Sequence, residues 1–219
     1  FILVPIYTNV LSPSEYGYVT LVYAFIGLMN VAFSYGMESA FLRHYLLDNE
    51  KKAQVLSTGY RTILLTSVVF TGLVLLLAPR IAPLISPAES FVTLIQLAAV
   101  VLGLDAVNII PFARLRGEGR ATVFAGLKLT KVMLELGGNL WLVVILSKGA
   151  EGILWSNIAG SGMAFLVLSV LTARHLAAGW SSSHARELLK FALPYIPAAA
   201  AVILIEMIDR SMIERIMGT

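Results

Sequence analysis

The stretch YGYVTLVYAFIGLMNVAFSYGM, residues 16–37, contains 22 residues without one charged side chain. A helix needs about 20 mostly apolar residues to cross the hydrocarbon core of a bilayer. The composition of the whole chain agrees with this reading, since 58% of its 219 residues are hydrophobic and only 13% are charged. A soluble domain has about a quarter of its residues charged. We therefore expect an integral membrane protein.

Six further segments are apolar enough to enter a membrane as helices. They are residues 1–11, 62–79, 90–113, 121–147, 152–173 and a segment that begins at residue 191. No segment shows the alternation of apolar and polar residues that a membrane β-barrel requires. The expected fold class is an all-α multi-span helical bundle of seven spans, because helices satisfy their own backbone polar groups in lipid.

Basic residues alternate between the connections of these spans. Nine lie in the second, fourth and sixth connections, and two lie in the first, third and fifth. The nine are Arg43, Lys51, Lys52, Arg114, Arg116, Arg120, Arg174, Arg186 and Lys190; the two are Arg80 and Lys148. Since cytoplasmic connections carry the excess of Lys and Arg, the even connections are expected to face the cytoplasm.

The fifth predicted span carries a polar stripe. Lys128, Lys131, Glu135 and Asn139 follow one another at steps of three and four residues, which places them on one face of a helix. The stripe either lines a cavity, with Lys131 as a contact for an anion, or contains a self-neutralising pair of Lys131 and Glu135 between helices. Both readings are open at this point.

Asp105 is the one acidic residue of the fourth predicted span. It lies nine residues before Arg114, or roughly 13 Å along a helix, which is near the middle of a membrane. It is a candidate site for a coupling proton or cation. The alternative is a protonated, hydrogen-bonded structural acid, because burial raises the pKa of a carboxyl group.

The second and seventh spans end in charged segments. Gly36 is expected to break the second span, and it is followed by Glu38 and Arg43. By position alone, Arg43 is expected to reach the cytoplasmic headgroups. The seventh span has Pro194 and Pro197 near its start and a charged network further along. That network is Glu206, Asp209, Arg210 and Glu214. Proline next to buried charge suits a hinged helix of a transporter.

Several kinds of chemistry lack their residues in this sequence. The chain has no cysteine, its three histidines are far apart, and no Gly-rich phosphate loop or catalytic signature occurs. We expect no metal site, no cofactor and no enzymatic activity.

Three stretches resemble the prokaryotic polysaccharide flippases of the multidrug/oligosaccharidyl-lipid/polysaccharide exporter superfamily. They are VPIYTNVLSPSEYGYVTLVYAF at 4–25, YGMESAFLRHY at 35–45 and LLKFALPYIPAAAAVILIEMIDRSMIERIMG at 188–218. The resemblance implies two lobes of six helices around a central cavity. Residues 1–180 would form the first lobe, with its first span truncated, and the Ser-rich linker and seventh span at 181–219 would begin the second.

The resemblance also implies a function and a set of partners. Members of this family move oligosaccharide linked to polyprenyl pyrophosphate from the cytoplasmic to the outer leaflet of the inner (cytoplasmic) membrane, as in lipopolysaccharide biosynthesis. Arg43, Arg114, Arg210 and Lys131 are the expected pyrophosphate contacts, since guanidinium groups stay charged when partly desolvated. Glu38, Asp105, Glu135, Asn139, Glu206 and Asp209 are the candidate cavity or coupling residues.

Other partners and functions follow from the same resemblance. Membrane lipids, a polysaccharide polymerase and assembly proteins are expected partners, and nucleic acid is not. Two alternatives stay open: a cation-coupled multidrug antiporter of the same superfamily, and a non-transporting membrane scaffold of a glycan assembly complex.

Overall fold

The computed structural model describes residues 10–47, 51–198 and 201. Every regular element in this part of the chain is a helix, as expected. The elements are α2 (Pro13–Ser34), α3 (Met37–Leu47), α4 (Lys52–Ile85), α5 (Phe91–Gly117), α6 (Ala121–Asn139), the π-helix η1 (Leu140–Ile145), α7 (Gly149–Ala173), the 3₁₀ turn η2 (Leu176–Ala178) and α8 (Ser182–Ala192).

Four helical segments in the described part are long and apolar enough to cross a membrane. They are Pro13–Leu47, Lys52–Ile85, Phe91–Gly117 and Gly149–Ala173. The predicted span at 121–147 is helical throughout α6 and η1 but is not among the four, because charged residues interrupt its apolar sequence. The predicted first span, and the seventh span beyond its first turns, lie outside the described residues.

The start and the end of α2 are encoded locally. Ser12 Oγ accepts a hydrogen bond from the backbone N–H of Glu15, and the Glu15 carboxylate accepts one from the backbone N–H of Ser12. This capping box, with Pro13 in the first turn, sets the beginning of the helix. The predicted break at Gly36 is confirmed. Tyr35 and Gly36 have φ angles of 32° and 73°, and this left-handed pair separates α2 from α3.

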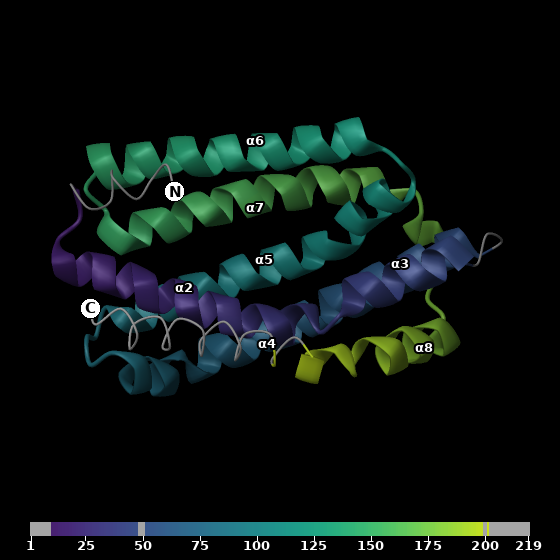
Figure 1. Ribbon diagram of the computed structural model, residues 1–219, viewed down its shortest axis with the longest axis horizontal. Coiled ribbons are helices and arrows are strands. Elements are labelled where there is room, and N and C mark those ends of the chain that lie inside the picture. The colour runs from purple at the N-terminus through teal and green to yellow at the C-terminus, as the bar shows by residue number, and fades with distance from the viewer. Residues whose placement is uncertain (1–9, 48–50, 199–200, 202–219) are drawn as a thin grey trace, which may run out of the picture.

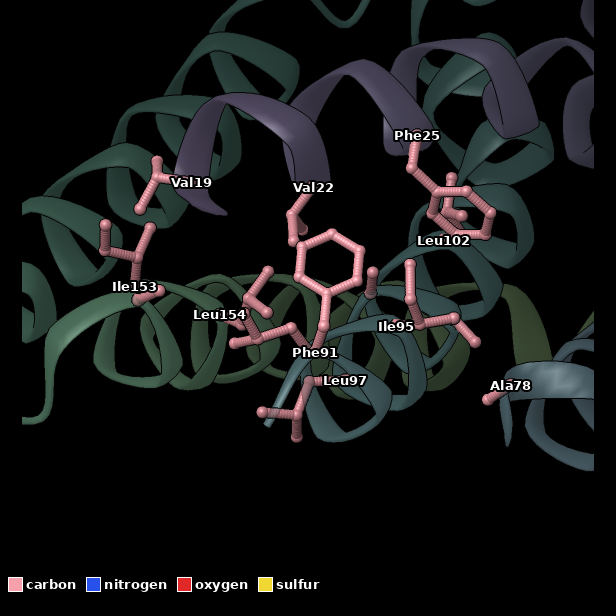
Figure 2. Close-up of a cluster of buried hydrophobic side chains, with 14 of the residues drawn as sticks. Val19, Val22, Phe25, Ala78, Phe91, Ile95, Leu97, Leu102, Ile153 and Leu154 are labelled. Atoms are coloured by element: carbon pink, nitrogen blue, oxygen red, sulfur yellow. The ribbon is translucent and has the colours of Figure 1, made fainter. Parts of the chain in front are cut away.

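Helix α5 occupies the centre of the bundle and packs against α4 and α7, with α2 and α3 also in contact with it (Figure 1). Helix α6 lies beside α7 on the far side from α4. Figure 2 shows the main apolar core, in which Val22 and Phe25 of α2 face Phe91 and Ile95 of α5, with Leu154 of α7 beside them. Since lipid is as apolar as this core, close packing rather than water exclusion holds such helices together.

Contacts between the connections show which of them lie at the same end of the bundle. At one end, Tyr45 of α3 reaches Glu118 after α5, and Arg61 of α4 donates to the carbonyl of Leu176 in η2. At the other end, Tyr18 of α2 packs against Phe91 at the start of α5. The basic second, fourth and sixth connections therefore share one end of the bundle, which the positive-inside rule makes the cytoplasmic end.

Candidate functional site

Four polar side chains meet between α5, α6 and α7 in the middle of the bundle. The Nζ of Lys131 lies 2.5 Å from Oδ1 of Asp105 and 3.6 Å from Oε1 of Glu135. The hydroxyl of Ser161 donates to the same Asp105 oxygen at 2.7 Å. We call Asp105, Lys131, Glu135 and Ser161 the polar cluster. It joins two of the regions that the sequence singled out, the stripe of the fifth span and the acid of the fourth.

Neighbouring residues on α5, α6 and α7 support the cluster. Lys131 and Glu135 are one helical turn apart on α6, so their side chains share a face. Glu135 lies directly against Gly160 of α7, where a Cβ atom would stand 2.6 Å from the Glu135 Cγ. One turn after Asp105, the Asn108 side chain donates to the backbone carbonyl of Ser161 at 3.1 Å and fastens α5 to α7. Gly160 leaves room for Glu135 beside α7, and the Asn108 hydrogen bond keeps α5 close to α7.

The cluster is only partly covered by the described residues. The side chain of Lys131 is 15% exposed, that of Glu135 is 22% exposed and that of Asp105 is 40% exposed. Ionisable groups at this depth are costly in hydrocarbon and normally face a bundle interior or a water-filled cavity. Among the three charged side chains, that of Asp105 is therefore the most exposed in the described part of the chain.

The charges of the cluster largely compensate one another. Lys131 is held by two carboxylates, so it is not the isolated cation that an anion contact would need. Lys128, one turn earlier on α6, lies 4.4 Å from the centre of the Phe112 ring as a cation–π contact. The hypothesis of a pair between Lys131 and Glu135 therefore agrees with the structure, and Asp105 forms a second ion pair with Lys131.

The end of the stripe is buried. Asn139 is 4% exposed, and its Oδ1 has no hydrogen-bond partner among the described residues. It stands where α6 changes into the π-helix η1, and π-helical turns are frequent at functional sites. The neighbouring Gly138 lies against Ser156 of α7, where a Cβ atom would be 2.9 Å from the serine hydroxyl.

Helix α7 contributes polar residues that were not predicted from the sequence. Besides Ser161, Asn157 lies one turn earlier on the same helix and donates to the Tyr23 hydroxyl of α2 at 3.0 Å. The spacing of Asn157 and Ser161 by four residues in an uncharged span was the available signal. Both residues extend the polar surface from α6 across α7 toward α2.

Arg114 is engaged in the fold at the end of the bundle that holds the basic connections. It is 6% exposed, its Nε donates to Glu118 at 2.7 Å, and its Nη1 donates to the carbonyl of Leu171 at 3.3 Å. Its Nη2 lies 3.2 Å from Nε2 of His175. Burial raises the pKa of Glu118, but hydrogen bonds from Arg114 and Tyr45 outweigh burial and leave this pKa below its ordinary value. The contacts of Arg114 tie α5 to the end of α7.

Two other predicted site residues lie on α3. The guanidinium of Arg43 stands 4.5 Å from the centre of the Phe191 ring, and Glu38 forms an ion pair with Arg116 of α5. Within the described residues, no contact joins Arg43, Arg114 and Lys131 to one another. Arg210, Glu206 and Asp209 lie outside the described residues.

No group of three or more His, Asp or Glu residues in the described part of the chain could hold a metal ion.

Comparison with known proteins gives one family. Residues 6–219 match the family described as polysaccharide biosynthesis protein. This chain belongs to the polysaccharide biosynthesis protein family. No curated protein and no solved structure matches the chain.

Membership in the polysaccharide biosynthesis protein family confirms the expected family and a role in polysaccharide biosynthesis. The described helices make this member a multi-pass membrane protein. The polar cluster therefore places charged groups between the membrane helices of a polysaccharide biosynthesis protein.

Proposed function

We propose that this polysaccharide biosynthesis protein is a transporter rather than an enzyme. It moves oligosaccharide linked to polyprenyl pyrophosphate across the cytoplasmic membrane by alternating access. The observation that carries the proposal is the polar cluster, because Asp105, Lys131 and Glu135 meet halfway along membrane helices and stay partly exposed. Polar groups at that depth mark substrate or ion pathways in membrane proteins.

The cations suited to the pyrophosphate differ in their surroundings. Arg43 is exposed at the cytoplasmic end, and Lys128 has an aromatic partner and no carboxylate within ion-pair distance among the described residues. These two, together with Arg210, are the proposed contacts. Arg114 is proposed to act through the fold alone, since its nitrogens already bind Glu118, Leu171 and His175.

The polar cluster suits a coupling site better than a pyrophosphate site, because its two acids offset its one lysine. A proton or cation arriving at Asp105 would compete with Lys131 for the same carboxylate oxygen. Such competition changes how α5 and α6 are held together. This is the kind of two-state contact that alternating access needs.

The test uses proteoliposomes loaded on one side with a labelled polyprenyl-pyrophosphate oligosaccharide, whose arrival in the other leaflet is read by a lectin. Lys131→Gln is expected to slow transport strongly, because it leaves Asp105 and Glu135 facing each other without a cation. Lys148→Gln, which removes an exposed lysine at the outer end, is the matched control and should transport normally.

A charge-balanced variant separates a coupling role from a packing role. Asp105→Asn/Lys131→Gln keeps the net charge of the cluster, so a purely structural cluster would regain transport in it. Continued loss, with the protein folded, supports a coupling role. Normal transport in all these variants would contradict a role of the polar cluster in transport, whereas absence of transport by the parent protein would favour a non-transporting scaffold.

A second function, cation-coupled export of small molecules, is favoured by one observation. The Asp105 carboxylate is 40% exposed, and an accessible acid at this depth suits a cationic drug. The same proteoliposomes distinguish the two, because an antiporter would move a fluorescent organic cation against a proton or sodium gradient and leave the labelled oligosaccharide in place.

A further inference from the structure

Helix α8 presents two different sides. Ala185, Leu188 and Ala192 are buried against α3 and α4 at the cytoplasmic end. Arg186 and Lys190, one turn apart, are exposed on the opposite side. Helix α8 therefore turns its cations away from the bundle.

These cations have no carboxylate partner among the described residues, since none of the ion pairs there includes Arg186 or Lys190. Glu187 is exposed on the same side and offsets one charge. We call Arg186 and Lys190 the basic face.

The exposed residues change in a fixed order along this segment. Ser182 and Ser183 come first, Arg186 and Lys190 follow, and the exposed Leu193 and Tyr195 come last. A chain that passes from water through the headgroups toward the hydrocarbon shows this order, and Tyr is enriched at the membrane interface. The basic face thus lies at the level where lipid phosphates are found.

We propose that the basic face binds the headgroups of anionic phospholipids in the cytoplasmic leaflet. The partner is a lipid phosphate rather than a soluble one, because the apolar side chains directly beyond Lys190 continue into the level of the acyl chains. Each Lys or Arg near a membrane surface contributes about fivefold to affinity for anionic lipid. The inference is independent of what the protein transports.

The test is a titration of the delipidated protein in neutral detergent, read by native mass spectrometry, with phosphatidylglycerol or with phosphatidylcholine of the same acyl chains. The protein is expected to bind phosphatidylglycerol at least about tenfold more tightly. Arg186→Gln/Lys190→Gln should lose most of this preference, and either single substitution should lose about fivefold. The matched control, Arg80→Gln/Lys148→Gln, removes two exposed cations at the outer end and should keep the preference.

Other variants and probes decide between explanations. Arg186→Lys/Lys190→Arg keeps both charges and should bind phosphatidylglycerol like the parent, which also guards against a Gln variant that fails to fold. Equal losses in the two Gln pairs, or no preference for phosphatidylglycerol, would overturn the proposal. So would displacement of phosphatidylglycerol by inorganic pyrophosphate, or tighter binding of a polyprenyl pyrophosphate at this face, since these results would assign it to a soluble phosphate or to the substrate.

Discussion

Lys131 of α6 and Asp105 of α5 are joined across two helices, with the lysine Nζ 2.5 Å from the carboxylate Oδ1. This oxygen also accepts the hydroxyl hydrogen of Ser161 at 2.7 Å. One carboxylate oxygen of α5 therefore binds a side chain of α6 and a side chain of α7.

Asp105→Asn should leave the protein folded in the membrane. The amide oxygen can still accept from Ser161 and Lys131, and Lys131 retains Glu135 at 3.6 Å. The expected loss in the free energy of unfolding is about 1–2 kcal/mol. Asp105→Ala, which leaves both donors without this acceptor, should cost more. Thermal unfolding of the two variants in detergent measures the difference, and disappearance of the Asn variant from the membrane would show that the charge is required for folding.

Gly160→Ala should displace Glu135 from the polar cluster. The added methyl group would stand 2.6 Å from the Glu135 Cγ and 2.9 Å from its Oε1. Such overpacking typically costs about 1–3 kcal/mol of stability.

Two comparisons test that cause. Gly162→Ala, two residues further along α7, has no atom within 4 Å of the added methyl and should cost little. In a Glu135→Ala background the effect of Gly160→Ala should shrink, because the group it displaces is gone. A full effect in that background would assign the cost to α7 itself.

Gly36→Ala should destabilise the junction between α2, α3 and the residues after α8. Its φ angle of 73° disfavours any side chain, and a Cβ atom there would lie 2.5 Å from the Tyr195 Cβ. We expect a loss of at least about 2 kcal/mol in the free energy of unfolding. Gly27→Ala, inside α2 with nothing within 4 Å, should be neutral or stabilising by up to about 1 kcal/mol. Similar effects of the two substitutions would refute the close approach at Gly36.

Arg114→Gln should unfold the cytoplasmic end more easily than Arg116→Gln does. Arg114 is buried and bonds to α7 through Leu171, whereas the Arg116–Glu38 pair is 44% exposed on both sides. Breaking a buried ion pair costs about 3–5 kcal/mol, and breaking an exposed one costs about 0–1 kcal/mol. Denaturant titrations of both variants test this ranking, which would be wrong if the losses were equal.

The lowered pKa of Glu118 predicts how the stability of the protein depends on pH. Burial opposes its ionisation, but Arg114 and Tyr45 lower its pKa below the ordinary value in the folded protein. A carboxyl group with a lowered folded pKa stabilises the fold above its unfolded pKa, and this contribution disappears as the pH falls through the folded pKa. The parent should therefore lose stability relative to Glu118→Gln on acidification below about pH 4.5. Parallel pH profiles of the two thermal midpoints would contradict this assignment.

Much of the architecture was predictable from local sequence. The apolar runs predicted the helices, the capping residues set the start of α2, and Gly36 predicted the break before α3. The alternation of basic residues predicted which connections share an end. These features depend on hydrophobicity, charge and backbone freedom of residues close in the chain, so they need no knowledge of the fold.

The partners of the polar residues required the tertiary structure. The spacing of Lys131 and Glu135 predicted their pairing within one helix, but nothing local showed that Asp105 and Ser161 would complete it. Nor did the sequence show that the Arg114 guanidinium is hydrogen-bonded to the Leu171 carbonyl and to His175. Helices that are apolar on every side carry no polar face to reveal how each is rotated about its axis. That rotation, decided only by how the helices pack, determines which charges meet in the middle of this protein.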